Sequence, residues 1–414
     1  MNMHPDTKNI QFQGCAALAG LANPYSEAYK EQHTAHIVEH GGIEAVIRAM
    51  GNYVRDARVQ QSGCSALRHI SYQRRTAQNA FAIAEQGGVE AVLVAMAAHP
   101  DNAYVQHQGC AALQKLTYYE DLRGLVVAAD GIDAILRALH HEDHRRNSRV
   151  QQQGLRALRN LALDSDANRR AIVDGECGGG VAATLRAMQK FQDATGIQVR
   201  GCSLMWQLAH VDHAKHRFIA NKGVDLVLGA LQKQKHAHDP YLVLEACGAL
   251  AKFAEDDATR ADMVSKGGAG IVAAAMARHE SKDNYKARHR RKWGCVVLCT
   301  LLRAGRREDK AAVVENGGVG AVLCAMEEHP HARDLQRKAC EEKVANAMDK
   351  LTAARQMMKQ QGMDEQAMFQ RAFQMMADPQ FRVSALQNMM QQQQQQASSS
   401  STTTVPPSTE KKSE

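Results

Sequence analysis

One stretch of twelve residues recurs along the chain, and it constrains the fold more than any single residue does. Its clearest copy, residues 105–116, reads V-Q-H-Q-G-C-A-A-L-Q-K-L. The same pattern returns at residues 59–70 and, with Leu155 in place of the cysteine, at residues 150–161. Looser copies occupy residues 10–21, 197–208, 242–253, 290–301 and, most altered, 335–346. Such a repeated unit predicts a solenoid, in which each copy packs on its neighbours.

The spacing of the copies points to helical repeats. Consecutive cysteine positions are 45 to 49 residues apart, in the range of helical solenoid repeats. Seven of the ten cysteines occupy this position: Cys15, Cys64, Cys110, Cys202, Cys247, Cys295 and Cys340. Equivalent positions in a solenoid face the neighbouring layer. We therefore interpret these residues as small core side chains rather than as a disulfide framework, which favours a reducing compartment.

Each unit is predicted to contain three helices. In the second full copy, residues 77–86 form a short first helix, and Gly87-Gly88 ends it, because glycine readily adopts the left-handed cap conformation. Residues 89–98 form the second helix, with apolar side chains at helical spacing. The turn at residues 99–102 leads to the third and longest helix, residues 104–118.

Helical geometry separates the buried face of the third helix from its polar face. At about 100° per residue, the cysteine and the apolar residues three and six positions later form one stripe about 140° wide. A glutamine four residues before the cysteine also lies inside this stripe. Its copies are Gln11, Gln60, Gln106, Gln151, Gln198 and Gln336. Buried amides are hydrogen-bonded, so we expect these side chains to bind backbone groups of the adjoining unit.

The three-helix unit, with a G-G-[IV]-x-A-[IV] start of the second helix and Q-x-x-G-C-x-A-L-x-x-L in the third, resembles armadillo repeats. The resemblance covers roughly residues 8–350. It implies an all-α, right-handed α-α superhelix, with a leading third helix and about seven repeats within residues 1–350. Similar cysteine-bearing repeats occur in the armadillo region of leucine-rich repeat kinases, although this sequence contains no kinase segment and no leucine-rich segment.

Composition changes after the array. Residues 351–390 contain eight methionines and are predicted to form two or three amphipathic helices. Residues 375–381, M-M-A-D-P-Q-F, are similar to the Met-rich helical modules of co-chaperones and ubiquitin-like shuttle proteins. These helices either cap the last repeat or hold apolar client segments, because flexible thioethers adapt to many shapes. Residues 391–414, rich in Gln, Ser and Thr, are predicted to be a disordered polar tail.

A polar column on the third helices is the candidate binding site. In armadillo proteins this side of the third helix lines the concave surface, so the resemblance implies a track that binds an extended, acidic peptide or protein. We expect the following residues to contribute: His69, Lys115, Arg156, Asn160, Gln207 and Lys252. The alternative interpretation is an ordinary solvated face.

The tryptophan ladder of armadillo importins is absent from this sequence. Those proteins carry a tryptophan four residues before an asparagine on the third helix. Here Arg156 occupies that position relative to Asn160, and neither Trp206 nor Trp293 completes such a pair. Lys115 would also repel a basic targeting signal. We therefore expect no nuclear-import receptor.

Other candidate sites have weaker support. Closely spaced histidines could hold a zinc ion, but they lie near turns without a neighbouring cysteine, so no metal site and no cofactor are expected. The histidines concerned are His33, His36 and His40; His140, His141 and His144; His210, His213 and His216; and His236 and His238. The basic run at residues 286–292 is interpreted as a solvated start of a third helix, with a nucleic-acid patch as the alternative. Motifs of hydrolases, phosphate loops and zinc proteases are absent, which argues against an enzyme.

The overall balance is mildly basic, with a formal net charge of +7 and a pI of about 8.8. This is weak for a nucleic-acid binder but compatible with an acidic protein partner. No apolar stretch approaches the length of a membrane span, so we expect a cytoplasmic or nuclear protein with no membrane partner. The sequence thus predicts a non-enzymatic protein-binding scaffold, or alternatively a co-chaperone-type adaptor.

Overall fold

The computed structural model describes residues 1–328 apart from residues 2, 5, 24–26, 73–76, 237–238, 278–284 and 304–312. Within this described part, every regular element is a helix. The chain separates into two compact units, Met1–Ala339 and Cys340–Glu414, and the described residues belong to the first. Gln336, the predicted array end at residue 350, the Met-rich segment 351–390 and the tail 391–414 lie outside the described residues.

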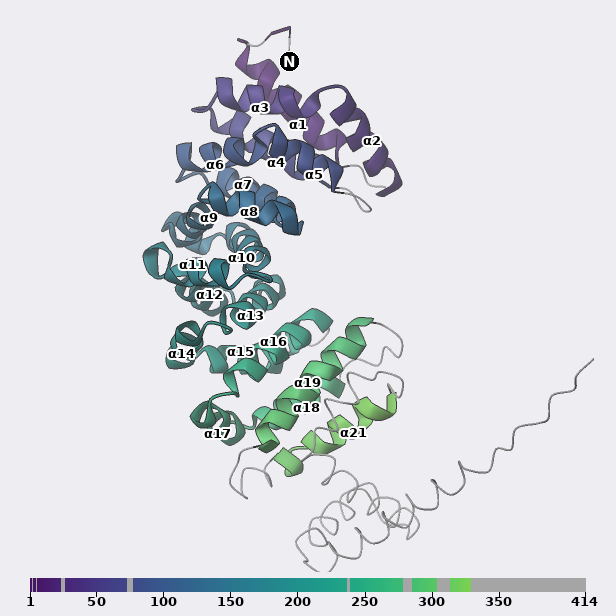
Figure 1. Ribbon diagram of the computed structural model, residues 1–414, viewed down its shortest axis with the longest axis vertical. Coiled ribbons are helices and arrows are strands. Elements are labelled where there is room, and N and C mark those ends of the chain that lie inside the picture. The colour runs from purple at the N-terminus through teal and green to yellow at the C-terminus, as the bar shows by residue number, and fades with distance from the viewer. Residues whose placement is uncertain are drawn as a thin grey trace, which may run out of the picture. The chain divides into compact units, whose positions relative to one another are not determined.

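The helices follow one another along the first unit in sets of three (Figure 1). The first helices are α2 (Glu27–Glu39), α5 (Gln78–Glu85), α8 (Glu120–Ala128), α11 (Asp166–Asp174), α14 (Asp212–Ala220) and α17 (Asp257–Ser265). The second helices are α3 (Gly42–Asn52), α6 (Gly88–Ala98), α9 (Gly131–His140), α12 (Gly179–Lys190), α15 (Gly223–Gln232), α18 (Gly268–Ala277) and α21 (Gly318–Glu328). The third helices are α1 (Lys8–Leu21), α4 (Ala57–Ile70), α7 (Ala103–Leu116), α10 (Ser148–Ala162), α13 (Thr195–Leu208), α16 (Pro240–Phe253) and α19 (Tyr285–Arg303). Short 3₁₀ turns connect some of them: η1 (Asp143–Arg146), η2 (Glu176–Gly178) and η3 (Gln234–His236).

Local signals place the helix ends where the sequence predicts them. The three helices predicted at residues 77–86, 89–98 and 104–118 are confirmed as α5, α6 and α7. Gly87 ends α5 with a φ of 83°, a left-handed conformation that glycine adopts without strain. Asn102 begins α7, because its side chain accepts hydrogen bonds from the first free backbone N–H groups of the helix.

The core is a stack of third helices. Each third helix from α1 to α19 packs against the next one in the series. The cysteines of this series lie at the contact and are fully buried, as the sequence predicts: Cys15, Cys64, Cys110, Cys202, Cys247 and Cys295. Burial raises the pKa of the Cys64 and Cys110 thiols to about 12, so both side chains behave as small neutral apolar groups.

Two of the sequence markers touch each other in five repeats, those of Gly63, Gly109, Gly154, Gly201 and Gly294. The glycine before the cysteine leaves room for the Met or Leu near the end of the second helix. A Cβ atom on Gly109 would lie 2.5 Å from Met96 Cγ, and one on Gly63 would lie 2.4 Å from Met50 Cγ. The glycine therefore sets how closely the second and third helices approach.

The buried glutamines join the second helix to the third. Gln106 Nε2 donates to the backbone oxygen of Met96 at 2.7 Å and to that of His99 at 2.9 Å. Gln60 makes the same pair of bonds to Met50 and Tyr53, at 2.8 Å each. Gln11, Gln151 and Gln198 also bridge two carbonyls each.

The expectation that these amides bind the adjoining unit is wrong. The partners of Gln60, Gln106, Gln151 and Gln198 are carbonyls at the end of the second helix and in the turn of the same unit, and those of Gln11 precede α1. The last carbonyls of a helix lack partners within it, so the nearest buried donor satisfies them.

Among the described residues, no single helix is long and apolar enough to cross a membrane. The helices α5 and α6, which are bent by 66° relative to each other, reach the required length and apolarity only as a pair.

We predict that Gln106→Leu lowers the free energy of unfolding by about 1–3 kcal/mol, because the buried carbonyl of Met96 loses its side-chain donor, while that of His99 still accepts from Asn102 N–H. Urea denaturation of the full chain, followed by circular dichroism, measures the change. Gln86→Leu is the matched control, since Gln86 is exposed. Equal stability of the two variants would show that the bridge is not a structural element.

Candidate functional site

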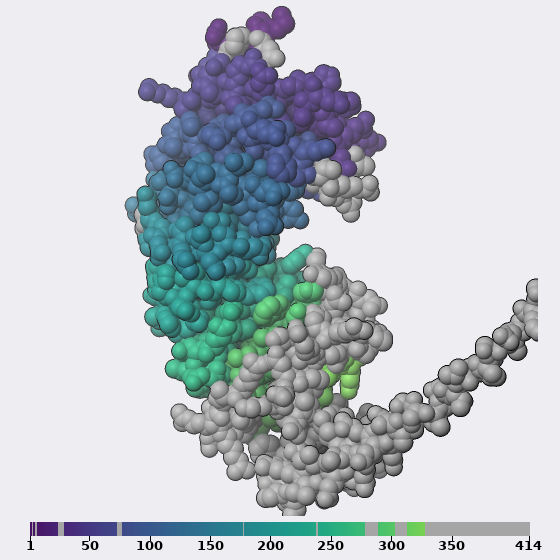
Figure 2. Space-filling view, viewed as in Figure 1, coloured from purple at the N-terminus to yellow at the C-terminus, as the bar shows by residue number. Residues whose placement is uncertain are grey.

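The candidate site lies on the third helices, which stand side by side in the order α4, α7, α10, α13 and α16. Figure 2 shows that the first unit is hollowed on one side, between the helices around α8 and the end of α16. All six residues of the predicted column are on these third helices or in their last turns. They differ in exposure and in what they contact.

Two members of the predicted column are buried, which differs from the expected polar exposed track. Asn160 is 4% exposed, and its Nδ2 donates to the backbone oxygen of Gln114 on the preceding third helix at 3.1 Å. Gln207 is 9% exposed. Asn160 thus joins α7 to α10, and this amide is occupied within the fold.

Lys252 is held by a neighbour of the same repeat. Its Nζ lies 2.8 Å from Glu255 Oε1, and Glu255 also pairs with Lys215 at 3.4 Å. His69, Lys115 and Arg156 are half-buried side chains. The structure therefore separates the predicted column into a partly accessible group on α4, α7 and α10 and a group that is buried or ion-paired.

Sequence reasoning missed several arginines beside the accessible group. Together with two of the predicted residues they form a set of half-buried cations that we call the basic strip. It consists of Arg68 on α4, Lys115 on α7, Arg156 and Arg159 on α10, and Arg200 on α13. These arginines could have been identified from the sequence, because they lie on the predicted third helices at positions outside the apolar stripe.

The cations of the basic strip act on one another. The pKa of Arg156 is lowered, first by burial and then by Arg200, Arg159 and Arg68. Burial also lowers the pKa of Arg68. These residues come from α4, α10 and α13, so the repulsion spans several repeats. Such a field attracts anionic groups.

Hydrogen bonds between repeats orient two of these arginines. Arg68 donates from Nη1 to Gln108 Oε1 at 3.2 Å, and Arg159 donates from Nε to Ser203 Oγ at 3.2 Å. The aromatic ring of Tyr72 lies 5.0 Å from Lys115 Nζ, a cation–π contact. The strip is thus built on ordered side chains.

The pKa of His69 reflects the positive electrostatic potential at one end of the strip. Its pKa falls from 6.5 to about 4, first because of burial and then because of the nearby charges of Arg68, Lys30 and Lys115. At neutral pH the imidazole is therefore uncharged and can both donate and accept a hydrogen bond.

One carboxyl group lies at the other end of the strip. Glu245 on α16 is 8% exposed, and burial raises its pKa, although Arg159, Ser203 and Arg200 act in the opposite direction. A raised pKa weakens the charge of this group, so Glu245 neutralises the strip less than a free carboxylate would.

The two tryptophans of the chain pack against each other. The rings of Trp206 on α13 and Trp293 on α19 pack edge to face, with centroids 4.6 Å apart. Trp206 reaches past α16 because Gly248 has no side chain, and a Cβ there would lie 2.3 Å from the indole. The sequence alone does not predict this pair, because the two residues lie on third helices two repeats apart. The glycine between them in the stack was the available signal.

Several histidines of the predicted clusters form hydrogen bonds with backbone groups of the fold. His140 Nε2 lies 3.2 Å from the Gly179 backbone oxygen, and His144 Nε2 lies 2.7 Å from that of Pro100. In the described part of the chain, one group could supply three metal ligands, namely the exposed residues His36, Glu39 and His40. Exposed groups of this kind are common without a metal, so we assign no metal site to these residues.

The basic run at residues 286–292 lies within α19, in agreement with the predicted helix. The expectation of a solvated start is wrong for two of its members, because Arg290 is 1% exposed and Arg291 is 5% exposed. Their stems fill space in the stack of third helices, which leaves no exposed patch at these two positions.

Comparison with known proteins agrees with this architecture. The family described as "Protein zer-1 homolog-like, C-terminal domain" matches residues 1–277. No curated protein sequence matches the chain. The crystal structure of an engineered protein is similar with 23% identity and a TM-score of 0.49, over 60% of this chain and 92% of that chain.

A second solved structure comes from work on a phosphorylation switch that controls the interaction between cadherin and beta-catenin. It has 13% identity and a TM-score of 0.56, over 81% of this chain and 59% of that chain. This likeness concerns the fold, and it confirms the predicted armadillo-type helical repeat.

We predict that Gly248→Ala destabilises the protein by about 1–3 kcal/mol, because the added methyl group displaces the Trp206 ring. Tryptophan fluorescence reports the change directly, since the chain has two tryptophans and they touch. Gly229→Ala, in α15 with nothing within 4 Å of the new Cβ, is the control. It should stabilise by about 0.5–1 kcal/mol. An unchanged emission spectrum in Gly248→Ala would refute the contact.

We also predict that the free energy of unfolding decreases as pH falls from about 6.5 towards 4. The pKa values of His69, His107 and His140 are lowered from 6.5 to about 4, so the unfolded chain binds protons first. Urea denaturation at about pH 7.5 and about pH 5 measures the difference. The difference in the free energy of unfolding between these two pH values should be smaller in His140→Gln than in the unmodified protein. It should be unchanged in the control His216→Gln, an exposed position. A full pH dependence in His140→Gln would contradict a neutral His140.

Proposed function

We propose that this chain, which belongs to the family described as zer-1 homolog-like C-terminal domains, is a non-enzymatic scaffold that binds an extended acidic peptide or protein. The family match covers residues 1–277, and the armadillo-type repeat is a fold whose members offer long surfaces for binding. The fold alone does not assign a partner. The basic strip is the feature that supports one.

The cluster of half-buried cations in the strip is the observation on which this proposal rests. Burial lowers the pKa of Arg68, Arg156 and Arg200, and the charges of neighbouring arginines lower that of Arg156 further. Glu245 acts on Arg200 in the opposite direction. Carboxylates of a partner would offset the repulsion at Arg156 and accept charge-assisted hydrogen bonds from the guanidinium groups.

The arrangement of the strip favours an extended ligand. Its residues lie on four successive third helices, α4, α7, α10 and α13. Packed helix axes are about 8–10 Å apart, so three such steps span about 24–30 Å, the length of about eight residues of extended chain. A helical peptide of the same number of residues would cover less than half of this distance.

Lys115 in the strip and His69 beside it have distinct roles in this proposal. Lys115 supplies a fixed charge, whereas the neutral imidazole of His69 can donate to, or accept from, the backbone of the partner. Asn160 and Lys252 support the surface rather than contact the partner, because their polar groups are already bonded within the protein. We place the protein in the cytoplasm, in keeping with the buried thiols of Cys15, Cys64, Cys110, Cys202, Cys247 and Cys295 on the third helices.

We predict that Lys115→Glu/Arg156→Glu weakens binding of an acidic peptide at least about tenfold, because two attractive charges become repulsive. The probe is a fluorescent peptide of about ten residues with glutamate at alternate positions, and fluorescence anisotropy measures its affinity. Arg48→Glu/Arg170→Glu makes the same change in net charge at other surface positions and is the control.

Equal losses in the two double variants would mean that the peptide senses only net charge, and the proposal would then fail. It would fail also if a peptide with glutamine at every glutamate position bound as tightly as the acidic one.

A further inference from the structure

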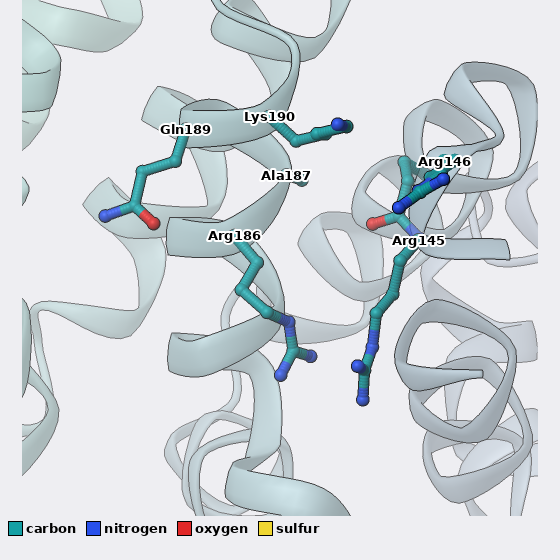
Figure 3. Close-up of a pocket in the computed structure, with 7 residues that line it drawn as sticks. Arg145, Arg146, Arg186, Ala187, Gln189 and Lys190 are labelled. Carbon is teal, nitrogen blue, oxygen red and sulfur yellow. The ribbon is translucent and has the colours of Figure 1, made fainter. Parts of the chain in front are cut away.

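A pocket of about 380 Å³ lies between the third and fourth full repeats, apart from the basic strip. It is lined by Arg145, Arg146, Gln151, Arg186, Ala187, Gln189 and Lys190. Figure 3 shows Arg186 and Lys190 of α12 on the side that faces Arg145 and Arg146 of η1, while Gln189 points away. Four cationic side chains from two elements therefore surround one space.

The charge of this pocket is unlike that of its neighbours. The pocket between α6 and α9 combines Arg137 with Glu176, and the one between α12 and α15 combines Lys222 and Lys233 with Asp225. No acidic residue lines the pocket of about 380 Å³. In the part of the chain that the structure describes, Arg145, Arg146 and Lys190 form no ion pair with a carboxylate.

Two of the arginines are held in position by one buried histidine. Arg145 Nε donates to the backbone oxygen of His140 at 3.0 Å, and Arg186 Nη2 contacts His140 Nδ1. His140 Nε2 lies 3.2 Å from the Gly179 backbone oxygen. Because arginine can only donate and a carbonyl can only accept, Nδ1 carries no proton and Nε2 carries one. The neutral imidazole of His140 thus contacts Arg186, while the backbone oxygen of the same residue binds Arg145.

The side chains of Arg145, Arg146 and Lys190 are exposed, and solvation alone is a sufficient explanation for Arg146 and Lys190. It does not explain why Arg145 and the half-buried Arg186 both contact His140, an arrangement that directs two guanidinium groups to one pocket. Paired guanidinium groups match anions that accept several hydrogen bonds at once. Four positive charges favour a group with two negative charges over a single carboxylate.

We propose that this pocket binds a phosphate group, as a small phosphorylated molecule or as a phosphorylated side chain. Arg145 and Arg186 would donate the hydrogen bonds that fix the phosphate, and Arg146 and Lys190 would add charge from the rim. The pocket shares no residue with the basic strip, so this inference goes beyond the proposed acidic partner, and either can fail without the other.

Isothermal titration calorimetry of the full chain at low ionic strength tests the proposal. The probes are sodium pyrophosphate, a short peptide with one phosphoserine, and the same peptide without phosphate. At least one phosphorylated probe should bind at a single site, and the unphosphorylated peptide should not. Binding of pyrophosphate indicates a small molecule as the source, and binding of the phosphopeptide alone indicates a modified side chain.

The variant Arg145→Gln/Arg186→Gln should weaken this binding at least about tenfold, because two charge-assisted hydrogen bonds are lost. Arg149→Gln/Arg170→Gln removes the same charge at exposed positions outside the pocket and should bind as the unmodified protein does. If circular dichroism shows that the first variant does not fold, Arg146→Gln/Lys190→Gln replaces it, with weakened binding again expected. The proposal is overturned if no phosphorylated probe binds, or if the pocket variant and the control lose affinity equally.

Discussion

The structure depends on one amide that bridges two backbone carbonyls. In four repeats the buried glutamine of the third helix binds the end of the second helix and the turn that follows it, as Gln106 does with Met96 and His99. Without this donor, the carbonyl of Met96 would lose a buried hydrogen bond, whereas that of His99 still accepts from the backbone N–H of Asn102. The bridge fixes the angle between the two helices, and the neighbouring glycine fixes their distance. This local geometry recurs in the four repeats whose third helices, α4, α7, α10 and α13, carry the basic strip.

Much of the fold could be predicted because it repeats. Seven cysteines in register gave the period, and an angle of about 100° per residue separated the buried face from the polar one. The same reasoning could not identify the partners of a side chain. Asn160 lies on the polar side of its helix, yet it is buried against α7 and binds the backbone oxygen of Gln114. Angles describe a single helix, whereas burial depends on what the neighbouring helix places opposite.

The features that sequence reasoning missed depend on contacts between repeats. Trp206 and Trp293 are far apart in the sequence and meet because Gly248 leaves space between them. The basic strip also joins residues of different repeats, and each of them is unremarkable on its own helix. Two separate surfaces result, the strip on the third helices and the pocket beside η1 and α12. Both concentrate positive charge on ordered side chains, which suits recognition of anionic groups.

The pKa of His69 is the measurement that tests the central claim most directly. It is lowered to about 4 by burial and by the cations around it, so it senses the potential where the partner is proposed to bind. NMR titration of a protein labelled at histidine can follow this residue with and without a glutamate-rich peptide. Carboxylates bound at the basic strip would raise the pKa of His69 towards 6.5. A pKa that stays the same when the peptide is bound would contradict binding at the strip.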